Sequence, residues 1–541
     1  MRSTMQETPL SVSTLLTFGS TVYGTSEIHT VTADGLRTGT FAELGARSAQ
    51  LAHALREDLG IRGDDRVATF MWNNQEHLEA YFAVPSMGAV LHTLNIRLYP
   101  DQVTYIANHA EDKVVLVDGS LIPLLARVLP GFSTVEHVVI VGDGDPAPLA
   151  AAGKQIHRYE ELLAGKPTTY DWPAVVETDA AAMCYTSGTT GNPKGVVYSH
   201  RSIYLHSMQV AMPQSFCLNE ANRVLTIVPM FHAMAWGIPY AALLTGAALI
   251  MPDRHLQAAA LVRAIEQSKA DFAGAVPTIW SDVLTHLDTY GGDISTLKRA
   301  VVGGSTVPPS LMTAFEERYG MRIIHAWGMT ETSPLGCVSH PPAGAEGEEE
   351  FAYRVMQGRF PAGVQARLAG PDGEIVPNDG EAVGELEVRG PWITGSYHRG
   401  EDPERFHDGW LRTGDVGTIT ADGYLTLTDR AKDVIKSGGE WISSVELENH
   451  LMAHPDVAEA TVVAVPDPRW QERPLAAVVL REGHTAAPAE LRDHLAGLIP
   501  KWQLPERWTY LKEVPKTSVG KFDKKEVRRA YAAGELEVTL L

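Results

Sequence analysis

Tyr185-Thr-Ser-Gly-Thr-Thr-Gly-Asn-Pro-Lys-Gly195 is a stretch of small and hydroxylated residues that separates two short apolar runs, 181–185 and 196–198. Both runs have the length and the composition of buried strands. The stretch therefore predicts a loop that joins two strands. A flexible surface linker is the alternative interpretation, because serine, threonine and glycine also dominate linkers.

The chemistry of this loop favours a polyphosphate ligand over a linker. Glycines at 188, 191 and 195 permit backbone angles that let amide N–H groups converge on an anion. The Walker pattern is not met, because Pro193 stands five residues after Gly188, where that pattern requires glycine. The remaining donors are one positive charge and four hydroxyl groups, on Lys194, Thr186, Ser187, Thr189 and Thr190.

The loop 186–195 resembles the signature loop of the adenylate-forming superfamily of acyl-CoA synthetases, peptide-synthetase adenylation domains and luciferases. The resemblance continues, in the family's order, through Pro229-Met-Phe-His232, Trp327-Gly-Met-Thr-Glu331, Trp410-Leu-Arg-Thr-Gly-Asp415, Asp429-Arg-Ala-Lys-Asp-Val-Ile-Lys436 and Pro515-Lys-Thr-Ser-Val-Gly-Lys521. The likeness is closest to bacterial medium- and long-chain fatty acyl-CoA synthetases, where Tyr81-Phe-Ala-Val-Pro-Ser-Met-Gly-Ala-Val and Lys436-Ser-Gly-Gly-Glu-Trp-Ile-Ser443 also have counterparts.

Composition limits the classes of protein to consider. The 541 residues exceed one ordinary domain, and a formal charge of −21 argues against a nucleic-acid-binding surface. The cysteines, Cys184, Cys217 and Cys337, lie far apart without ligand spacing and are expected to be small core residues of a cytoplasmic protein. No secretory signal is visible at the N-terminus. The nearly uncharged stretch 233–252 is expected to be a buried helix and strand, with a membrane span as the alternative.

The pattern of apolar runs predicts an α/β fold. Helix-like runs such as 41–59 alternate with apolar runs, which indicates parallel sheets covered by helices. After about residue 360, short alternating strands at 364–368, 384–388 and 417–427 predict a β-barrel-like subdomain, whereas 341–350 resembles a solvated loop. The apolar runs of the first part are 67–72, 89–94, 114–117, 138–141, 224–228, 248–251, 272–276, 300–302 and 323–326.

The expected domains are a large layered N-terminal adenylation domain, 1–429, with its β subdomain at about 360–429, and a small mobile α+β domain, 436–541. Residues 430–435 are the expected hinge between them. In the small domain we expect helices at 445–452 and 489–498 and strands at 460–465 and 475–480. A module of about a hundred residues is within the usual size of a domain.

The resemblance implies a site for ATP and Mg²⁺. Glu331 and the hydroxyl group of Thr186 are the implied Mg²⁺ ligands, since magnesium prefers hard oxygen donors, and Thr330 is the implied contact of the α-phosphate. A surface position is the alternative for Glu331. The implied contacts of adenine are Gly304, His325, Ala326 and Trp327, and those of ribose are Asp415 and Arg430.

Several of these implied roles have a structural alternative. The family usually has tyrosine where this chain has Trp327, so an aromatic face is kept and a phenol hydroxyl is lost. His325 alone would more often be a core histidine, and Asp415 alone would be a turn residue.

The resemblance also implies residues for the acyl group and for coenzyme A. His232 would orient the substrate carboxylate, and the uncharged residues 233–238 and 301–305 would line an apolar pocket beside Ala233 and Trp236. An ammonium buried without a carboxylate is costly, which disfavours an amino acid substrate. Trp236 is expected to gate the acyl tunnel, with core packing as the alternative. For His232 the alternative is a structural role.

Lys521 would bridge the carboxylate and the α-phosphate, and Lys432 would be the hinge residue. Gly438 and Gly439 would pass the pantetheine arm, and Lys436 and Trp441 would contact nucleotide. Outside the family pattern, these lysines would be ordinary solvated charges.

These features predict an AMP-forming acyl-CoA synthetase, which is an acid–thiol ligase. Its cofactors would be ATP, Mg²⁺ and coenzyme A, and its substrate would be a fatty or similar apolar acid. The family resemblance also implies a homodimer. The alternatives are a ligase for short-chain, thioether or aryl acids and a luciferase-like oxygenase. A peptide-synthetase module is disfavoured because the chain ends soon after Lys521, and a non-catalytic protein because Lys521, Glu331 and His232 are all present.

Overall fold

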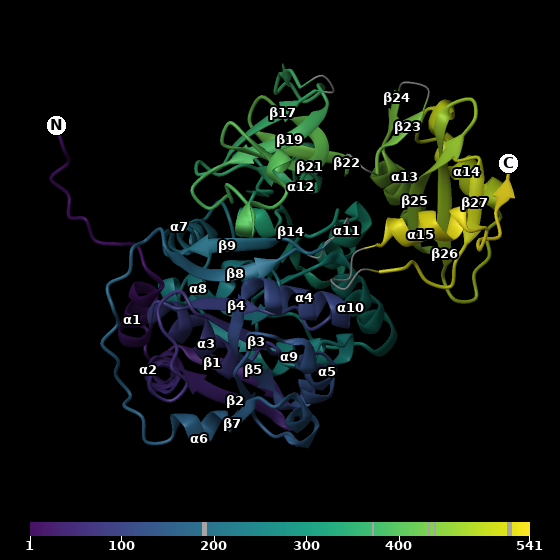
Figure 1. The fold of residues 1–541 in the computed structure, drawn as a ribbon. Helices are drawn as coiled ribbons and strands as arrows, with labels where there is room; N and C mark the ends of the chain where they lie inside the picture. Colours follow the sequence, from purple (N-terminus) through teal and green to yellow (C-terminus); the bar gives the residue numbers. More distant parts are fainter. Residues whose placement is uncertain (187–191, 371–372, 431–432, 438–439, 517–521) are drawn as a thin grey trace.

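The computed structural model describes residues 1–186, 192–370, 373–430, 433–437, 440–516 and 522–541, without the side chains of Arg430, Lys436, Glu440 and Trp441. Figure 1 shows a large body formed by the N-terminal and middle parts of the chain and a small body formed by the C-terminal part. Helices and strands alternate through the large body. The predicted α/β fold, with a large N-terminal and a smaller C-terminal domain, is confirmed.

One sheet of the large domain has seven strands in the order β7-β6-β5-β3-β4-β8-β9. Its pairs are parallel except for β8 with β9. Successive residues such as Val67 and Ala68 belong to different cores, because a strand covered by helices is apolar on both faces. The strands are β3 (Arg66–Phe70), β4 (Val90–Thr93), β5 (Asp112–Asp118), β6 (His137–Val141), β7 (Gln155–Arg158), β8 (Ala180–Tyr185) and β9 (Gly195–Ser199).

The other sheet of the large domain has 15 strands and changes character along its length. Strands β1 (Glu27–Thr32), β10 (Arg223–Thr226), β11 (Ala248–Met251), β12 (Phe272–Ala275), β13 (Arg299–Val302) and β14 (Arg322–Trp327) pair in parallel. Strand β2 (Gly35–Thr40) pairs antiparallel to β1.

From β15 onward the pairs are antiparallel, and we refer to β15–β22 as the β subdomain. Its strands are β15 (Cys337–Val338), β16 (Gly358–Arg359), β17 (Gln365–Ala369), β18 (Ile375–Val376), β19 (Gly384–Arg389), β20 (Phe406–His407), β21 (Trp410–Ile419) and β22 (Tyr424–Arg430).

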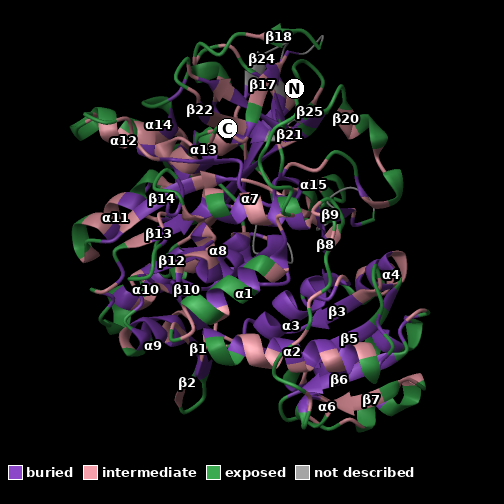
Figure 2. Ribbon diagram, turned by 90° about the vertical axis from the view of Figure 1, so that its left-hand side faces the viewer, coloured by how far each residue is buried: buried purple, intermediate pink, exposed green. Residues whose placement is uncertain are grey.

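A layer of helices separates the two sheets. Every residue of α3 (Gln75–Ser86) is buried, and Figure 2 shows this helix in the colour of buried residues. One apolar core contains residues of α3 together with Val114 of the first sheet and Leu249 of the second, so it joins the two sheets. The other helices that contribute to this core are α1 (Val12–Val22), α2 (Phe41–Glu57), α6 (Tyr159–Leu163), α7 (His200–Ala211) and α8 (Ile238–Thr245).

The outer faces of the two sheets are covered by separate helices. Residues of α4 (Pro100–Ala110) and α5 (Ile122–Val128) pack on the seven-stranded sheet. Residues of α9 (Ala258–Ser268), α10 (Pro277–Tyr290), α11 (Pro309–Tyr319) and α12 (Gly347–Val355) pack on the second sheet. The large domain is therefore layered.

The small domain has its own sheet of six strands, in the order β24-β23-β26-β27-β28 with β25 paired to β26. Its main core contains residues of α13 and α14 with those of the sheet, so it buries an apolar interior without the large domain. The elements are β23 (Ile435–Ser437), β24 (Glu440–Ile442), α13 (Ser444–Met452), β25 (Val457–Asp467), β26 (Gln471–Leu480), α14 (Pro488–Ala496), β27 (Arg507–Tyr510), α15 (Lys524–Ala532) and β28 (Thr539–Leu540).

Three local expectations differ from the structure. The solvated loop predicted at 341–350 is wrong in its last part, because α12 begins at Gly347. The single strand predicted at 417–427 is two strands, since Thr420 to Gly423 turn between β21 and β22. Cys217 is only half-buried, although Cys184 and Cys337 are buried as expected and all three thiols are free.

The apolar stretch 233–252 contains a turn, a short helix and a strand. Residues Ala233–Gly237 form η4, α8 follows, and β11 completes the stretch. Within the described parts of the chain, no helix combines the length and the apolar character that crossing a bilayer requires.

Candidate active site

The phosphate loop begins and ends on neighbouring strands, as the sequence predicts. Thr186 follows β8, and its amide donates to the carbonyl of Lys194, 2.9 Å away. The amide of Lys194 in turn donates to Thr186 Oγ1 at 3.1 Å. These two bonds close the base of the loop. Ser187, Gly188, Thr189 and Thr190 lie outside the described residues.

Residues of the β subdomain cover the end of this loop. A Cβ on Gly195 would lie 3.0 Å from His398 Cβ and 3.0 Å from Tyr185 Cζ, so only glycine permits this approach. The ammonium group of Lys194 lies 4.0 Å from Glu401 Oε2. The end of the loop is therefore held against the segment 397–405, which lies between β19 and β20.

Glu331 is buried in the short helix η5 (Thr330–Thr332), which follows β14. The hydroxyl of Tyr397 donates to Glu331 Oε1 at 2.5 Å, and the hydroxyl of Tyr198 on β9 donates to the carbonyl of Thr330 at 2.8 Å. Burial and the Glu331 carboxylate raise the pKa of Tyr397, so this phenol stays protonated and donates. Tyr198 thus connects η5 to the strand that follows the phosphate loop, and Tyr397 connects it to the segment 397–405.

The donor set near the loop fits magnesium by its chemistry. Thr186 offers a hydroxyl oxygen and Glu331 a carboxylate, and hard oxygen ligands are what Mg²⁺ prefers. Arg405 is a cation close to Glu331 that the sequence analysis missed. Burial opposes the charge of Arg405, but Tyr397 and Glu331 outweigh it and raise the pKa of the guanidinium.

Trp327 and Asp415 are in direct contact. The indole N–H donates to Asp415 Oδ2 at 2.8 Å, and both residues are buried. A Cβ on Gly336 would lie 2.2 Å from Trp327 Cε3, so glycine lets the backbone approach the indole ring. Asp415 on β21 also pairs in register with Arg430 on β22, whose side chain lies outside the described residues. The structure therefore brings together the residues expected at adenine and at ribose.

The ends of β13 and β14 form the rest of the expected adenine contacts. Val302 pairs with His325, and a Cβ on Gly303 would lie 2.6 Å from the carbonyl oxygen of Ala326. Gly304 adopts a left-handed φ of 85°. His325 donates through Nδ1 to the carbonyl of Val355 at 3.0 Å, and burial lowers its pKa to about 4. Its imidazole is therefore neutral and fixes the end of α12.

The segment after His232 has an unusual backbone. Ala233, Met234, Ala235 and Trp236 have φ values of 42°, 52°, 50° and 56°, and Gly237 continues the turn with φ of 73°. Left-handed helical backbone costs roughly 1–2 kcal/mol per L-residue, so the turn stores strain. His232 itself is extended and half-buried at the start of the turn.

The turn places Trp236 over the ends of two parallel strands. A Cβ on Gly274 would lie 3.6 Å from Trp236 Cε3, and a Cβ on Gly303 would lie 3.7 Å from Cη2. The indole thus lies across glycines at the ends of β12 and β13. Trp236 of the expected acyl-pocket segment 233–238 therefore lies against Gly303 of the other expected segment, 301–305.

Most small-domain residues assigned from the resemblance lie outside the described residues, namely Lys432, Gly438, Gly439 and Lys521. Lys436 and Trp441 pair in register between β23 and β24, although their side chains are not described. Lys516 and Phe522 form a bridge that closes the loop containing Lys521. Burial raises the pKa of Asp282 on α10, and Lys516 is close enough to oppose this rise, so the base of that loop faces the large domain (Figure 1).

The sequence analysis missed Tyr397, Arg405 and Tyr198. Tyr397 and Arg405 lie in a segment rich in turns, where no periodicity marks a buried side chain. Tyr198 belongs to a strand that was expected, but its hydroxyl bond to η5 joins residues distant in sequence. Only the glycine and charge content of 395–405 could have indicated a functional loop.

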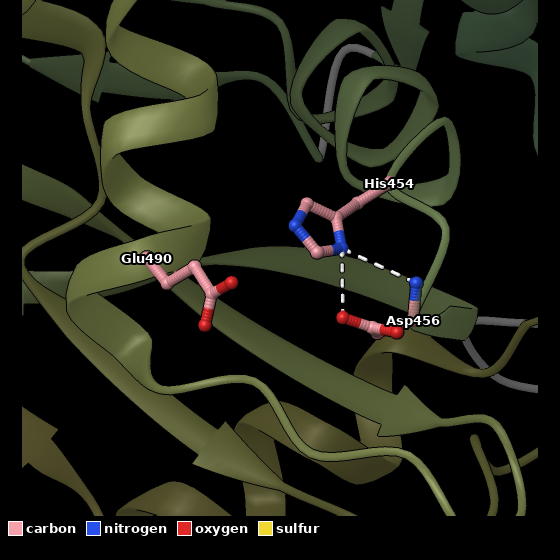
Figure 3. A group of neighbouring side chains, drawn as sticks. All are labelled: His454, Asp456 and Glu490. Carbon is pink, nitrogen blue, oxygen red and sulfur yellow. Dashed lines mark hydrogen bonds and ion pairs between the residues drawn. The ribbon is translucent and has the colours of Figure 1, made fainter.

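One group in the small domain has the residue types of a metal site. Among the described residues, ligand atoms of His454, Asp456 and Glu490 lie within 4.8 Å of one another (Figure 3). His454 Nδ1, however, accepts the amide N–H of Asp456 at 3.3 Å and lies 3.9 Å from Asp456 Oδ2. Asp456 Oδ1 is bonded to His484 Nδ1 at 2.5 Å. Internal contacts already use the ligand atoms of His454 and Asp456, and we assign no metal there.

Comparison with known proteins identifies the family. A family model described as AMP-binding enzyme matches residues 21–398, and one described as AMP-binding enzyme C-terminal domain matches residues 446–521. The chain is 42% identical over 535 residues to the 3-methylmercaptopropionyl-CoA ligase of Ruegeria pomeroyi, covering 98% of this chain and 99% of that protein. It is 44% identical over 542 residues to the long-chain-fatty-acid–CoA ligase of Thermus thermophilus, covering 98% and 97%.

A solved structure shows the same fold. The anthranilate CoA ligase AuaEII in complex with anthranoyl-AMP superposes with a TM-score of 0.88 at 24% identity, covering 99% of this chain and 100% of that one. The matches extend over both domains described above. The chain therefore belongs to the AMP-binding, adenylate-forming enzyme family, in which it is an AMP-forming acid–thiol ligase that makes acyl-CoA.

Proposed function

We propose that this enzyme ligates an apolar carboxylic acid of medium or long chain to coenzyme A, with Mg²⁺ as the metal. In the first half-reaction a carboxylate oxygen attacks the α-phosphorus of ATP and pyrophosphate leaves. In the second, the thiol of coenzyme A attacks the acyl carbon, its proton is lost and AMP leaves. Acyl-AMP is the intermediate that connects the halves.

The described geometry supports the following assignments of nucleotide contacts. Asp415, oriented by the indole N–H of Trp327, presents a carboxylate to two ribose hydroxyls. Lys194 and the amides of its loop bind the polyphosphate, and Thr186 and Glu331 are the residues that would hold Mg²⁺. A metal held there would neutralise phosphate charge that otherwise repels the attacking carboxylate. Thr330, beside Glu331, is assigned to the α-phosphate.

The position of Trp236 is the observation that carries the substrate assignment. Its indole lies over Gly274 and Gly303, and the segments 233–238 and 301–305 carry no charge. An apolar chain that enters beside His232 therefore meets apolar surface, whereas an ammonium group would be left without a carboxylate. A long chain requires the indole to move, so we assign Trp236 as the gate of the acyl tunnel.

A short thioether acid is the second candidate. It is favoured by the 42% identity over 98% of the chain to a ligase named for 3-methylmercaptopropionyl-CoA. Such an acid is short enough to bind beside His232 without displacing Trp236. The two candidates use the same adenylate chemistry and differ only in the space beyond the carboxylate.

Pyrophosphate release with a series of acids separates these candidates. Each buried methylene contributes about 0.8 kcal/mol, so kcat/KM should rise about fourfold per added carbon until the pocket is full. The matched pair is 3-(methylthio)propionate and pentanoate, which differ only by sulfur in place of one methylene. A maximum at a medium or long acid supports the main proposal, and a maximum at the thioether acid, well above pentanoate, supports the second.

Assays with acetate, with an amino acid and without oxygen test the reaction class. A preference for acetate or an amino acid would contradict both candidates. AMP release should require coenzyme A and should be unchanged when oxygen is removed. Oxygen-dependent AMP release would instead indicate the luciferase-like alternative.

We further infer that the small domain serves the two half-reactions in two orientations. Lys516, at the base of the loop that contains Lys521, lies near Asp282 of the large domain, whereas β23 and β24, which flank Gly438 and Gly439, pair elsewhere on the small domain. One orientation cannot present both segments to one site. In this proposal residues 430–435 are the hinge and Lys432 is its pivot. A homodimer and a cytoplasmic location remain predictions.

A further inference from the structure

A chain of hydrogen bonds crosses the boundary between the two domains. Ser444, the first residue of α13, donates from its amide and from its hydroxyl to Asp429 Oδ2, at 2.7 Å and 2.5 Å. The ammonium group of Lys524, the first residue of α15, donates to Ser444 Oγ at 2.5 Å. Ser444 therefore joins a carboxylate of the large domain to a cation of the small domain.

The cluster is buried and charged. Ser444 and Glu448 are buried, as is Asp429, and Lys524 forms an ion pair with Glu448 Oε1 at 2.8 Å. Burial opposes the charge of Lys524, but the carboxylates of Glu448, Asp429 and Asp433 outweigh it and raise its pKa. Hydrogen bonds to charged groups are stronger than those between neutral groups, so the bond to Asp429 is a substantial contact.

The bonds of this cluster divide into two classes. Lys524 and Glu448 both belong to the small domain, where Glu448 Oε1 also accepts the hydroxyl of Thr461 at 3.0 Å. Those bonds persist however the domain is oriented. The bonds from Ser444 to Asp429 instead connect residues on opposite sides of the proposed hinge, as does the 2.5 Å bond from Ser443 Oγ to the carbonyl of Thr428. A rotation about residues 430–435 would break them.

The orientation that these bonds hold is the one in which Lys516, at the base of the loop that contains Lys521, lies near Asp282 of the large domain. Lys524 is the third residue after Lys521, so its fixed position at Ser444 and Glu448 sets the start of α15 directly beside that loop. The cluster therefore stabilises one orientation of the small domain without touching substrate.

We propose that Ser444 is a positioning residue that selects the adenylation orientation through its bonds to Asp429, and that these bonds break before coenzyme A reacts. This inference rests on the two-orientation mechanism of the proposed function. It adds a specific element that the mechanism needs, because the equilibrium between orientations must be set by contacts that differ between them.

The test compares two isosteric variants in the two half-reactions. Ser444→Ala removes the hydroxyl that connects Asp429 to Lys524 and leaves every charge in place. Thr461→Val removes a hydroxyl bond to the same buried cluster, but one that lies within the small domain. Adenylation is measured by pyrophosphate exchange, and thioester formation by mixing synthetic acyl-AMP with coenzyme A.

The expected result is a change in the ratio of the two rates. Ser444→Ala should lower adenylation about tenfold relative to thioester formation, which corresponds to about 1.4 kcal/mol of orientational preference. Thr461→Val should leave the ratio unchanged even where it lowers Tm. Equal ratios in both variants and in the native enzyme would overturn the proposal. If the native enzyme itself makes no thioester from acyl-AMP, the proposed function fails instead.

A disulfide variant provides a second measurement that does not depend on the rates of Ser444→Ala. In Asp429→Cys with Ser444→Cys, oxidation should hold the small domain in the adenylation orientation. The oxidised protein should form acyl-AMP but no thioester, and reduction should restore the second step. The native enzyme treated with the same oxidant is the control. Thioester formation at equal rates in the oxidised and reduced variant would overturn the inference.

Discussion

Replacing Trp327 by phenylalanine tests the central contact of the nucleotide site. The change keeps an aromatic face for adenine but removes the indole N–H that donates to Asp415 Oδ2 at 2.8 Å. Both partners are buried, and a hydrogen bond to a charged group contributes about 1.5–3 kcal/mol. If this bond orients Asp415 for ribose, losing it should weaken ATP binding by about 10- to 100-fold.

The assay is the dissociation constant of ATP by calorimetry, together with kcat/KM for ATP and for 2′-deoxy-ATP by pyrophosphate release. Trp327→Phe should lose most of the preference for ATP over 2′-deoxy-ATP, because that preference depends on the hydrogen bond that the 2′-hydroxyl of ribose donates to Asp415. Trp327→Tyr should recover part of it if the phenol hydroxyl reaches the carboxylate.

Trp392 supplies a matched control for this experiment. Its buried indole N–H donates to the carbonyl of Leu335 at 2.9 Å and belongs to the same apolar core as Trp327. Trp392→Phe should lower Tm without changing the preference between the two nucleotides. The reasoning is refuted if Trp327→Phe behaves like Trp392→Phe, with a loss of stability and an unchanged affinity for ATP.

Three other predictions follow from the site and its surroundings. Lys521→Ala should slow adenylation by about three powers of ten, roughly 4 kcal/mol, and spare thioester formation, whereas Lys432→Pro should do the reverse; equal losses in both half-reactions would argue for one fixed site. Trp236→Ala should let a fatty acid bind without ATP in a calorimetric titration, and a large fall in Tm with unchanged binding order would favour plain core packing. Burial lowers the pKa of His206 to about 3, so the folded protein resists a proton that the unfolded chain accepts below about pH 6.5. The urea concentration at the midpoint of unfolding should therefore decrease as the pH is lowered from about 7 to about 4.5. His206→Asn should make this pH dependence weaker, and an equal dependence of the midpoint on pH in both proteins would contradict the prediction.

Much of the large domain was predictable because its strands are buried on both faces. The run 248–251 coincides with β11, the run 272–276 extends one residue beyond β12, and the run 323–326 is one residue shorter than β14 at each end. Covered parallel strands consist of continuous apolar residues, so their position is visible in the sequence. The phosphate loop was equally clear, since glycine and hydroxyl residues between two such runs have few other uses.

The contacts that complete the site were less accessible from the sequence. The bond from Tyr397 to Glu331 and the bond from Tyr198 to Thr330 join segments far apart in the chain, and no local pattern encodes such pairs. For Trp327 the sequence indicated the loss of a phenol hydroxyl, but only the structure shows that an indole N–H reaches Asp415. The bond from His325 Nδ1 to the carbonyl of Val355 is likewise a contact that only the structure shows.

The left-handed turn at 233–237 was also beyond sequence reasoning. Alanine, methionine and tryptophan have no preference for positive φ, so the apolar stretch resembled the start of a helix. Packing imposes the unusual backbone instead. A Cβ on Gly237 would lie 2.5 Å from His206 Cε1, which shows how closely the turn is enclosed.

The left-handed turn at 233–237 limits which side chains can be introduced there to change the acyl specificity. Positive φ is a genuine outlier for a β-branched residue, so valine, isoleucine and threonine at 233–236 would add strain to a segment that already stores it. Glycine, asparagine and unbranched residues are compatible with this backbone. Libraries that reshape the acyl pocket should therefore vary side-chain length at these positions. β-Branched residues should be introduced at the ends of β12 and β13 instead, where the backbone is extended.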